Sequence, residues 1–83
     1  MGFLTTKLPA LKEAQVEAQR MLEATESALK EDPHLLNEAE AAKIVATIEK
    51  LRLAIAGDNR RVINLAMDDL GFETQEFAHR RMN

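Results

Sequence analysis

Hydrophobic residues recur every three or four positions along most of this chain, which is the spacing of one face of an α-helix. The first such stretch covers residues 10–31, and its charged side chains lie mostly off the apolar stripe. Pro9 suits the first turn of a helix, and Pro33 disfavours helical geometry at Asp32, so the two prolines predict both ends. The apolar stripe consists of Leu11, Ala14, Ala18, Met21, Leu22, Ala28 and Leu29.

A second helix is predicted over residues 38–56. Asn37 followed three positions later by Glu40 is the pattern of a capping box, in which both side chains bond backbone N–H groups at a helix start. Glu38 and Glu40 also place negative charge at the positive end of the helix dipole. The predicted buried face, with Arg52 toward its edge, consists of Ala41, Ile44, Val45, Ile48, Leu51 and Ile55.

The second helix is expected to end at Gly57, just past its last apolar residue. Glycine is common there because it adopts the left-handed conformation without a side-chain penalty. Asp58 or Asn59 can then cap a third helix, so the connection is very short. Such a short connection favours two adjacent, antiparallel helices.

The third helix is predicted over residues 59–81, with Gly71 inside it as a point where the helix is expected to bend or break. Three amphipathic helices in one short chain indicate an all-α fold, an up-down-up antiparallel three-helix bundle. We divide the chain into an irregular segment, 1–9, and a helical unit, 10–83. The third apolar face consists of Val62, Ile63, Ala66, Met67, Leu70, Thr74, Phe77 and Ala78.

Composition excludes several classes of protein. The 83 residues suffice for one small domain, and the net charge of -3 argues against nucleic-acid binding. The pairs Arg60-Arg61 and Arg80-Arg81 are the only basic clusters, and we interpret each as a solvated helix end. The longest apolar run, 53–56, is far shorter than the roughly 20 residues of a membrane span. The absence of cysteine excludes disulfides and thiolate metal sites and fits a reducing compartment. We expect a cytoplasmic location.

Side chains with catalytic or metal-binding chemistry are few and scattered. His34 and His79 lack a partner ligand at helical spacing, so a metal site is not expected. Asp68 and Asp69 are neighbours that diverge on a helix, which argues against acid–base cooperation. We expect no catalytic residue, no metal and no cofactor bound by this segment.

Four segments, taken in order, resemble the helical lid of the HscA branch of the seventy-kilodalton heat-shock chaperones. The stretch "EAQVEAQRMLEATESALKED" resembles the helix that leads into the lid bundle, and "LLNEAEAAKIVATIEKL" resembles the next helix. The Gly-Asp connection and following helix are similar to "AGDNRRVINLAMDDL", and the end of the lid is similar to "TQEFAHRRMN". The resemblance covers residues 11–83 and implies a fragment of a larger chaperone. It departs from the family pattern at residues 1–9, which are a local variant or an artificial addition, and at Gly71 and His79.

The resemblance implies a function in client binding. In this family the lid closes over a peptide held by a β-sheet subdomain, and ATP binding in another domain opens it. HscA-type chaperones act in iron–sulfur cluster assembly with a J-type co-chaperone and a scaffold protein. The ATP site belongs to the parent chaperone, so the fragment is not expected to be an enzyme. By the same resemblance, Gln19, Arg20 and Glu23 fall near the latch contacts between the first helix and the β-subdomain.

Other interpretations stay open at this stage: the lid of a generic DnaK-type chaperone, a free-standing helical dimerisation or adaptor module, and an enzyme fragment. A further expectation is self-association of the isolated chain through the segment before Met21. An uncovered apolar patch tends to find a partner, and a terminal helix is readily exchanged between copies. The residues expected to form this patch are Phe3, Leu4, Leu8 and Leu11.

Overall fold

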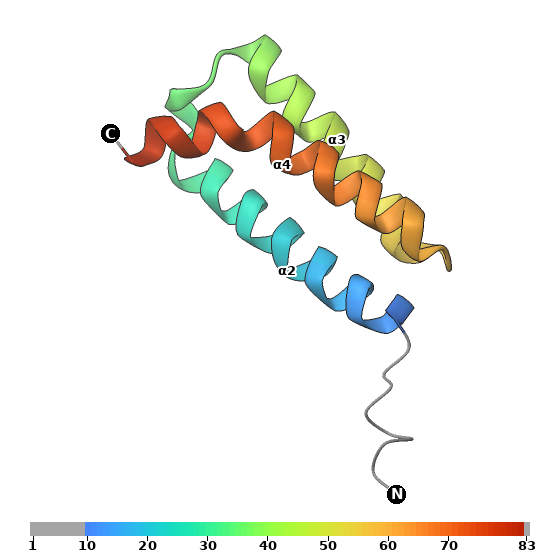
Figure 1. Cartoon of the computed structure of the whole chain (residues 1–83). Coiled ribbons are helices and arrows are strands. Elements are labelled where there is room, and N and C mark those ends of the chain that lie inside the picture. Colours follow the sequence, from blue (N-terminus) through green and yellow to red (C-terminus); the bar gives the residue numbers. More distant parts are fainter. Residues whose placement is uncertain (1–9, 83) are drawn as a thin grey trace, which may run out of the picture.

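Three long helices joined by two short connections make up the computed structural model, which describes residues 10–82 (Figure 1). They are α2 (Ala10–Glu31), α3 (Glu38–Ala56) and α4 (Arg60–Met82), with a 3-10 helix, η1 (Pro33–Leu35), between the first two. Helices α2 and α4 run in the same direction and α3 runs in the opposite one (Figure 1). The predicted up-down-up three-helix bundle is therefore confirmed. Pro9 and the rest of the expected irregular segment, 1–9, lie outside the described residues.

Asparagine side chains cap both later helices: Asn37 as predicted, and Asn59 of the two alternatives, Asp58 and Asn59. The Asn37 Oδ1 accepts a hydrogen bond from the Glu40 N–H at 2.8 Å, and the Asn37 N–H donates to the Glu40 carboxylate at 3.0 Å. This completes the expected capping box. The Asn59 Oδ1 accepts from the N–H groups of Arg61 at 2.9 Å and Val62 at 3.3 Å. Because Asn59 is the cap, α4 begins one residue later than predicted.

The expected left-handed conformation of Gly57 is wrong. Gly57 has φ -89° and ψ -169°, which is extended backbone, and no described residue has a positive φ. Its N–H donates to the Ala54 carbonyl at 3.0 Å. The Gln15 side-chain amide of α2 donates to the carbonyls of Ile55 at 3.1 Å and Gly57 at 3.3 Å. Because a distant side chain satisfies these carbonyls, a left-handed turn is not needed to close the helix.

The core lies along the axis where all three helices meet, and each helix contacts the other two. The predicted stripe on α2 is confirmed, whereas Val45, Val62 and Ala78, expected in the core, are exposed. In place of Val45, helix α3 buries Thr47 and Ala54. Thr47 is tolerated because its hydroxyl donates to the Ile44 carbonyl at 2.8 Å. The buried apolar residues are Ala14, Ala18, Leu22, Ile44, Ile48, Leu51, Ala54, Ile63, Ala66, Leu70 and Phe77.

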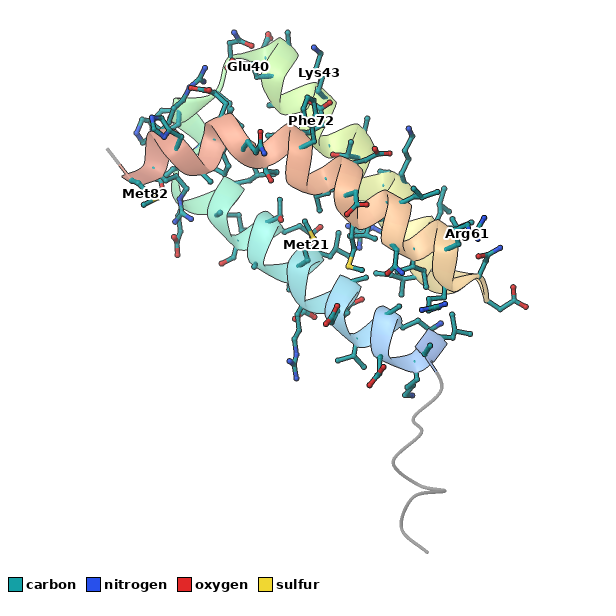
Figure 2. The ribbon with its side chains drawn as sticks, viewed as in Figure 1. Met21, Glu40, Lys43, Arg61, Phe72 and Met82 are labelled. Carbon is teal, nitrogen blue, oxygen red and sulfur yellow. The ribbon has the colours of Figure 1, made fainter. Side chains whose placement is uncertain are left out.

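Helix α4 continues through Gly71, so the helix does not break at this glycine. Gly71 faces α2, and a Cβ at this position would lie 3.6 Å from the terminal methyl of Met21. Figure 2 shows the Met21 side chain directed from α2 toward α4. The intrinsic cost of glycine in a helix, about 1 kcal/mol relative to alanine, therefore does not end α4 here.

Arg80, near the end of α4, binds the connection between α2 and α3. Its guanidinium donates to both carboxylate oxygens of Glu40 at 2.9 Å each and to the Leu35 carbonyl at 2.7 Å. A weaker contact of 3.5 Å joins Arg80 to Glu76 one turn earlier. This bidentate geometry is the strongest arrangement of an arginine and a carboxylate. The helix end is accessible to solvent, as predicted, but the ion pairs that hold it were not predicted from the sequence.

Arg81 attaches the same end of α4 to the end of α2. Its guanidinium donates to Glu31 at 2.7 Å and to Asp32 at 2.8 Å. It also lies 5.9 Å from the centre of the buried Phe77 ring, within the range of a cation–π contact. The three helices are thus joined by polar contacts at this end, which we call the closed end of the bundle.

Candidate interaction surface

The three residues predicted as latch contacts lie on the side of α2 that faces away from the core. Gln19, Arg20 and Glu23 are all exposed. The Gln19 amide donates to the Glu23 carboxylate at 3.0 Å, and Arg20 forms no ion pair with any residue between 10 and 82. The helix therefore presents two charges and an amide on one accessible face. Their role in a latch stays a prediction.

Two further residues share this face and were missed by the sequence analysis. Val16 is 41% exposed, and together with Lys12 it lines a shallow groove of about 240 Å³. The groove is completed by Gln15, Gln19 and Arg20. The signal was available, because Val16 is a β-branched hydrophobic residue that does not fit the stripe of α2. We define the outer face of α2 as Lys12, Val16, Gln19, Arg20 and Glu23.

A larger groove, of about 430 Å³, separates the first turns of α2 from the start of α4. Glu13 and Glu17 line it from α2, and Arg60 and Asn64 line it from α4. All four side chains are exposed. The groove therefore carries charges of both signs in contact with solvent. The groove is accessible to another surface.

The remaining titratable candidates are dispersed. His34, Asp68, Asp69 and His79 are exposed, and they lie on the connection before α3 and on α4. Within the described range, 10–82, no group of three His, Asp or Glu side chains is arranged to hold a metal ion.

One carboxylate has a strongly altered proton affinity. The bidentate hydrogen bonds from Arg80, followed by the hydrogen bond from the Asn37 N–H, lower the pKa of Glu40 from 4.5 to about 2. Glu40 has its oxygens occupied by these donors, so it is available neither as a base nor as a nucleophile. Its role is to hold α3 and α4 together at the closed end.

Relatives of this chain come from bacteria and are much longer than it is. It is 50% identical over 74 residues to a protein of Burkholderia thailandensis and 51% identical over 74 residues to one of Azoarcus sp. strain BH72, each named chaperone protein HscA homolog. The relative of the same name in Aromatoleum aromaticum is 46% identical over 74 residues. Each match covers 89% of this chain and 12% of the relative.

Two other comparisons gave no match: neither a protein-family model nor a solved structure matches the chain. No helix between residues 10 and 82 combines the length and the hydropathy that a membrane span requires.

Proposed function

We propose that this chain, which is homologous to a segment of the bacterial HscA-type chaperones, is the helical lid that closes over a client peptide in such a chaperone. The observation that supports this most is the combination of about 50% identity over 74 residues with a bundle of three helices. The chain spans 12% of the length of its relatives, which fits one structural unit of a larger protein.

In this proposal α2 carries the contact with the peptide-binding β-subdomain. Its outer face is accessible and offers Arg20 and Glu23 for charged contacts and Val16 for an apolar one. A closed lid obstructs the exit of a bound peptide, so it lowers the dissociation rate without altering the peptide's own contacts. Helices α3 and α4 hold α2 from the opposite side.

The wider setting is proposed from the name of the relatives. The parent chaperone would bind ATP in another domain, and it would act with a J-type co-chaperone and an iron–sulfur scaffold protein in the cytoplasm. We therefore expect the isolated chain to hydrolyse no ATP and to show no measurable affinity for extended peptides. ATP hydrolysis by the purified chain, with contaminating chaperones excluded, would contradict this.

A chimera tests the lid directly. The matching segment of the Burkholderia thailandensis relative is replaced by this chain, and dissociation of a fluorescent client peptide is compared with that from the same protein truncated before the segment. We expect slow release from the chimera and fast release from the truncated protein. Equal rates for the two proteins would refute the lid function.

Variants of the outer face of α2 test the proposed latch contacts without altering the packing of the bundle. In the chimera, Arg20→Ala and Glu23→Ala should accelerate release, because each removes a charge proposed to contact the β-subdomain. Lys50→Ala is a matched control, since Lys50 is an exposed residue of α3 that does not lie on this face. If the control accelerates release as much as the other two, the latch assignment is wrong.

Self-association of the isolated chain stays a prediction. Phe3, Leu4 and Leu8 lie outside the described residues, and Leu11 is partly buried against the core. Sedimentation over a wide range of concentration should show dimers or larger species if the segment before Met21 carries an uncovered patch. A strict monomer at millimolar concentration would contradict the expectation, and it would also weaken the alternative of a free-standing dimerisation module.

A further inference from the structure

Phe72 is the largest side chain that the bundle leaves in solvent near its middle. It is 71% exposed, and Leu65, two helical turns earlier on α4, is 58% exposed. Figure 2 shows Phe72 on the side of α4 opposite to Met21 and α2. A spacing of seven residues places both side chains on one stripe of the helix. This stripe contributes nothing to the core and lies away from the outer face of α2.

A hollow lies beside Phe72, between α3 and α4. It has a volume of about 230 Å³. Its apolar walls include Leu36, Ile44 and Phe77, and Lys43 lies at its edge. Phe72 and Lys43 lie next to each other in Figure 2. The hollow is also lined by Glu40, Glu73 and Glu76. An exposed aromatic side chain next to a hollow with apolar and charged walls is an arrangement in which a partner's side chain can be enclosed.

The surroundings of Phe72 are acidic. Asp68, Asp69 and Glu76 are its neighbours at the spacing of one helical turn, and Glu73 adjoins it in sequence and lines the hollow. Within residues 10–82, neither the two aspartates nor Glu73 forms an ion pair, and Glu76 has only its 3.5 Å contact with Arg80. Lys43 is the basic residue that lines the hollow. It forms no ion pair within residues 10–82.

We propose that this surface, the Phe72 face, docks a basic amphipathic segment of a partner protein, with an apolar side chain of that segment in the hollow. We define the face by Lys43, Leu65, Asp69, Phe72 and Glu76. Charge complementarity selects this occupant, because lysines or arginines of the segment would pair with carboxylates that lack a partner here. A second copy of the chain would bring the same carboxylates against their own kind. The proposal is independent of the lid function, since it concerns neither α2 nor a client peptide.

The test is a titration of the 15N-labelled full chain, followed in 1H–15N correlation spectra. The probe is an 18-residue helical peptide of leucine and lysine, and its counterpart has glutamate in place of lysine. We expect saturable shifts of amides around Lys43, Phe72 and Glu76 with the lysine peptide and none with the glutamate peptide. Shifts spread over acidic residues of α2, such as Glu13 and Glu17, would overturn the proposal.

Two variants and a control complete the experiment. Phe72→Ser should weaken binding by about tenfold or more, as expected for a central aromatic residue of an interface. Asp69→Asn should weaken binding and reduce its dependence on salt. Val45→Ser, at a half-exposed valine that does not line the hollow, should change affinity by less than about twofold. Circular dichroism checks that each variant is folded. Unchanged affinity of the Phe72 variant, or shifts on this face caused by raising the concentration of the chain alone, would refute the assignment.

Discussion

The guanidinium of Arg80 and the carboxylate of Glu40 meet through two parallel hydrogen bonds of 2.9 Å, although 40 residues separate them in sequence. Glu40 belongs to the first turn of α3 and Arg80 to the last turns of α4, so the pair fixes the relative position of two helix ends. Glu40 also caps its own helix through the Asn37 N–H. One carboxylate therefore serves both local and long-range structure.

Acid should weaken the bundle through this carboxylate. The pKa of Glu40 is lowered from 4.5 to about 2, so its stabilising effect is complete above pH 4.5 and is lost as the pH falls through 2. Glu40→Gln should lower the melting temperature at pH 7 and reduce the loss of stability between pH 4.5 and 2. Glu17→Gln is the control, because Glu17 is exposed and makes no ion pair in the described chain. Parallel pH profiles for Glu40→Gln and the unmodified chain would contradict this.

Gln15 should stabilise the bundle from the other end. Its amide donates to two carbonyls at the end of α3, and the replacement Gln15→Met leaves them without these donors. We expect a loss of about 1 kcal/mol in the free energy of urea unfolding. Gln19→Met removes only an exposed hydrogen bond within α2 and should cost less than about 0.5 kcal/mol. Equal losses would mean that the Gln15 contact does not contribute to stability.

Two glycine replacements distinguish the turn from the helix. Gly71→Ala should stabilise the chain by up to about 1 kcal/mol, because alanine favours the helix and its Cβ would lie 3.6 Å from Met21. Gly57→Ala should be tolerated as well, since its backbone is extended and the new Cβ would lie 3.4 Å from the Ala54 carbonyl oxygen. Thermal unfolding of both variants provides the measurement. Strong destabilisation by Gly57→Ala would indicate that Gly57 adopts the left-handed conformation expected from the sequence.

Leu51 and Leu53 offer a matched pair on α3. Leu51 is fully buried and Leu53 is 74% exposed. Leu51→Ala should cost about 2–5 kcal/mol, enough to unfold much of so small a domain, whereas Leu53→Ala should cost less than about 0.5 kcal/mol. Urea unfolding followed by circular dichroism compares them. Similar midpoints for the two variants would be incompatible with the register of α3 described here.

Local signals in the sequence were sufficient to predict the helices, the capping by Asn37, and Asp58 or Asn59 as the next cap, because each depends on residues within one or two turns. The conformation of Gly57 was not predictable in this way, because it depends on Gln15, about 40 positions away. The same holds for the pairs made by Arg80 and Arg81. Sequence periodicity alone located the apolar stripes, but it could not say which side of α3 would face α4.

The candidate surfaces were predictable to different degrees. Gln19, Arg20 and Glu23 came from a family resemblance, and the structure adds that they share an exposed face with Val16. The hollow beside Phe72 has no signature in sequence, because its lining comes from residues 36–44 and 72–77, which only the packing of the folded chain brings together. Exposure of Phe72 becomes evident only when the packing of α4 against both neighbours is known.

The closed end of the bundle also determines when this unit can form during protein synthesis. Arg81 binds Glu31, 50 positions earlier, and Arg80 binds Leu35, 45 positions earlier. A ribosome adds roughly 5–20 residues per second, so several seconds separate the emergence of α2 from that of its last partners. During that interval α2 and α3 expose Leu22, Ile44 and Leu51 without the helix that covers them. These apolar side chains are covered only after translation has passed Arg81 and α4 has packed against them.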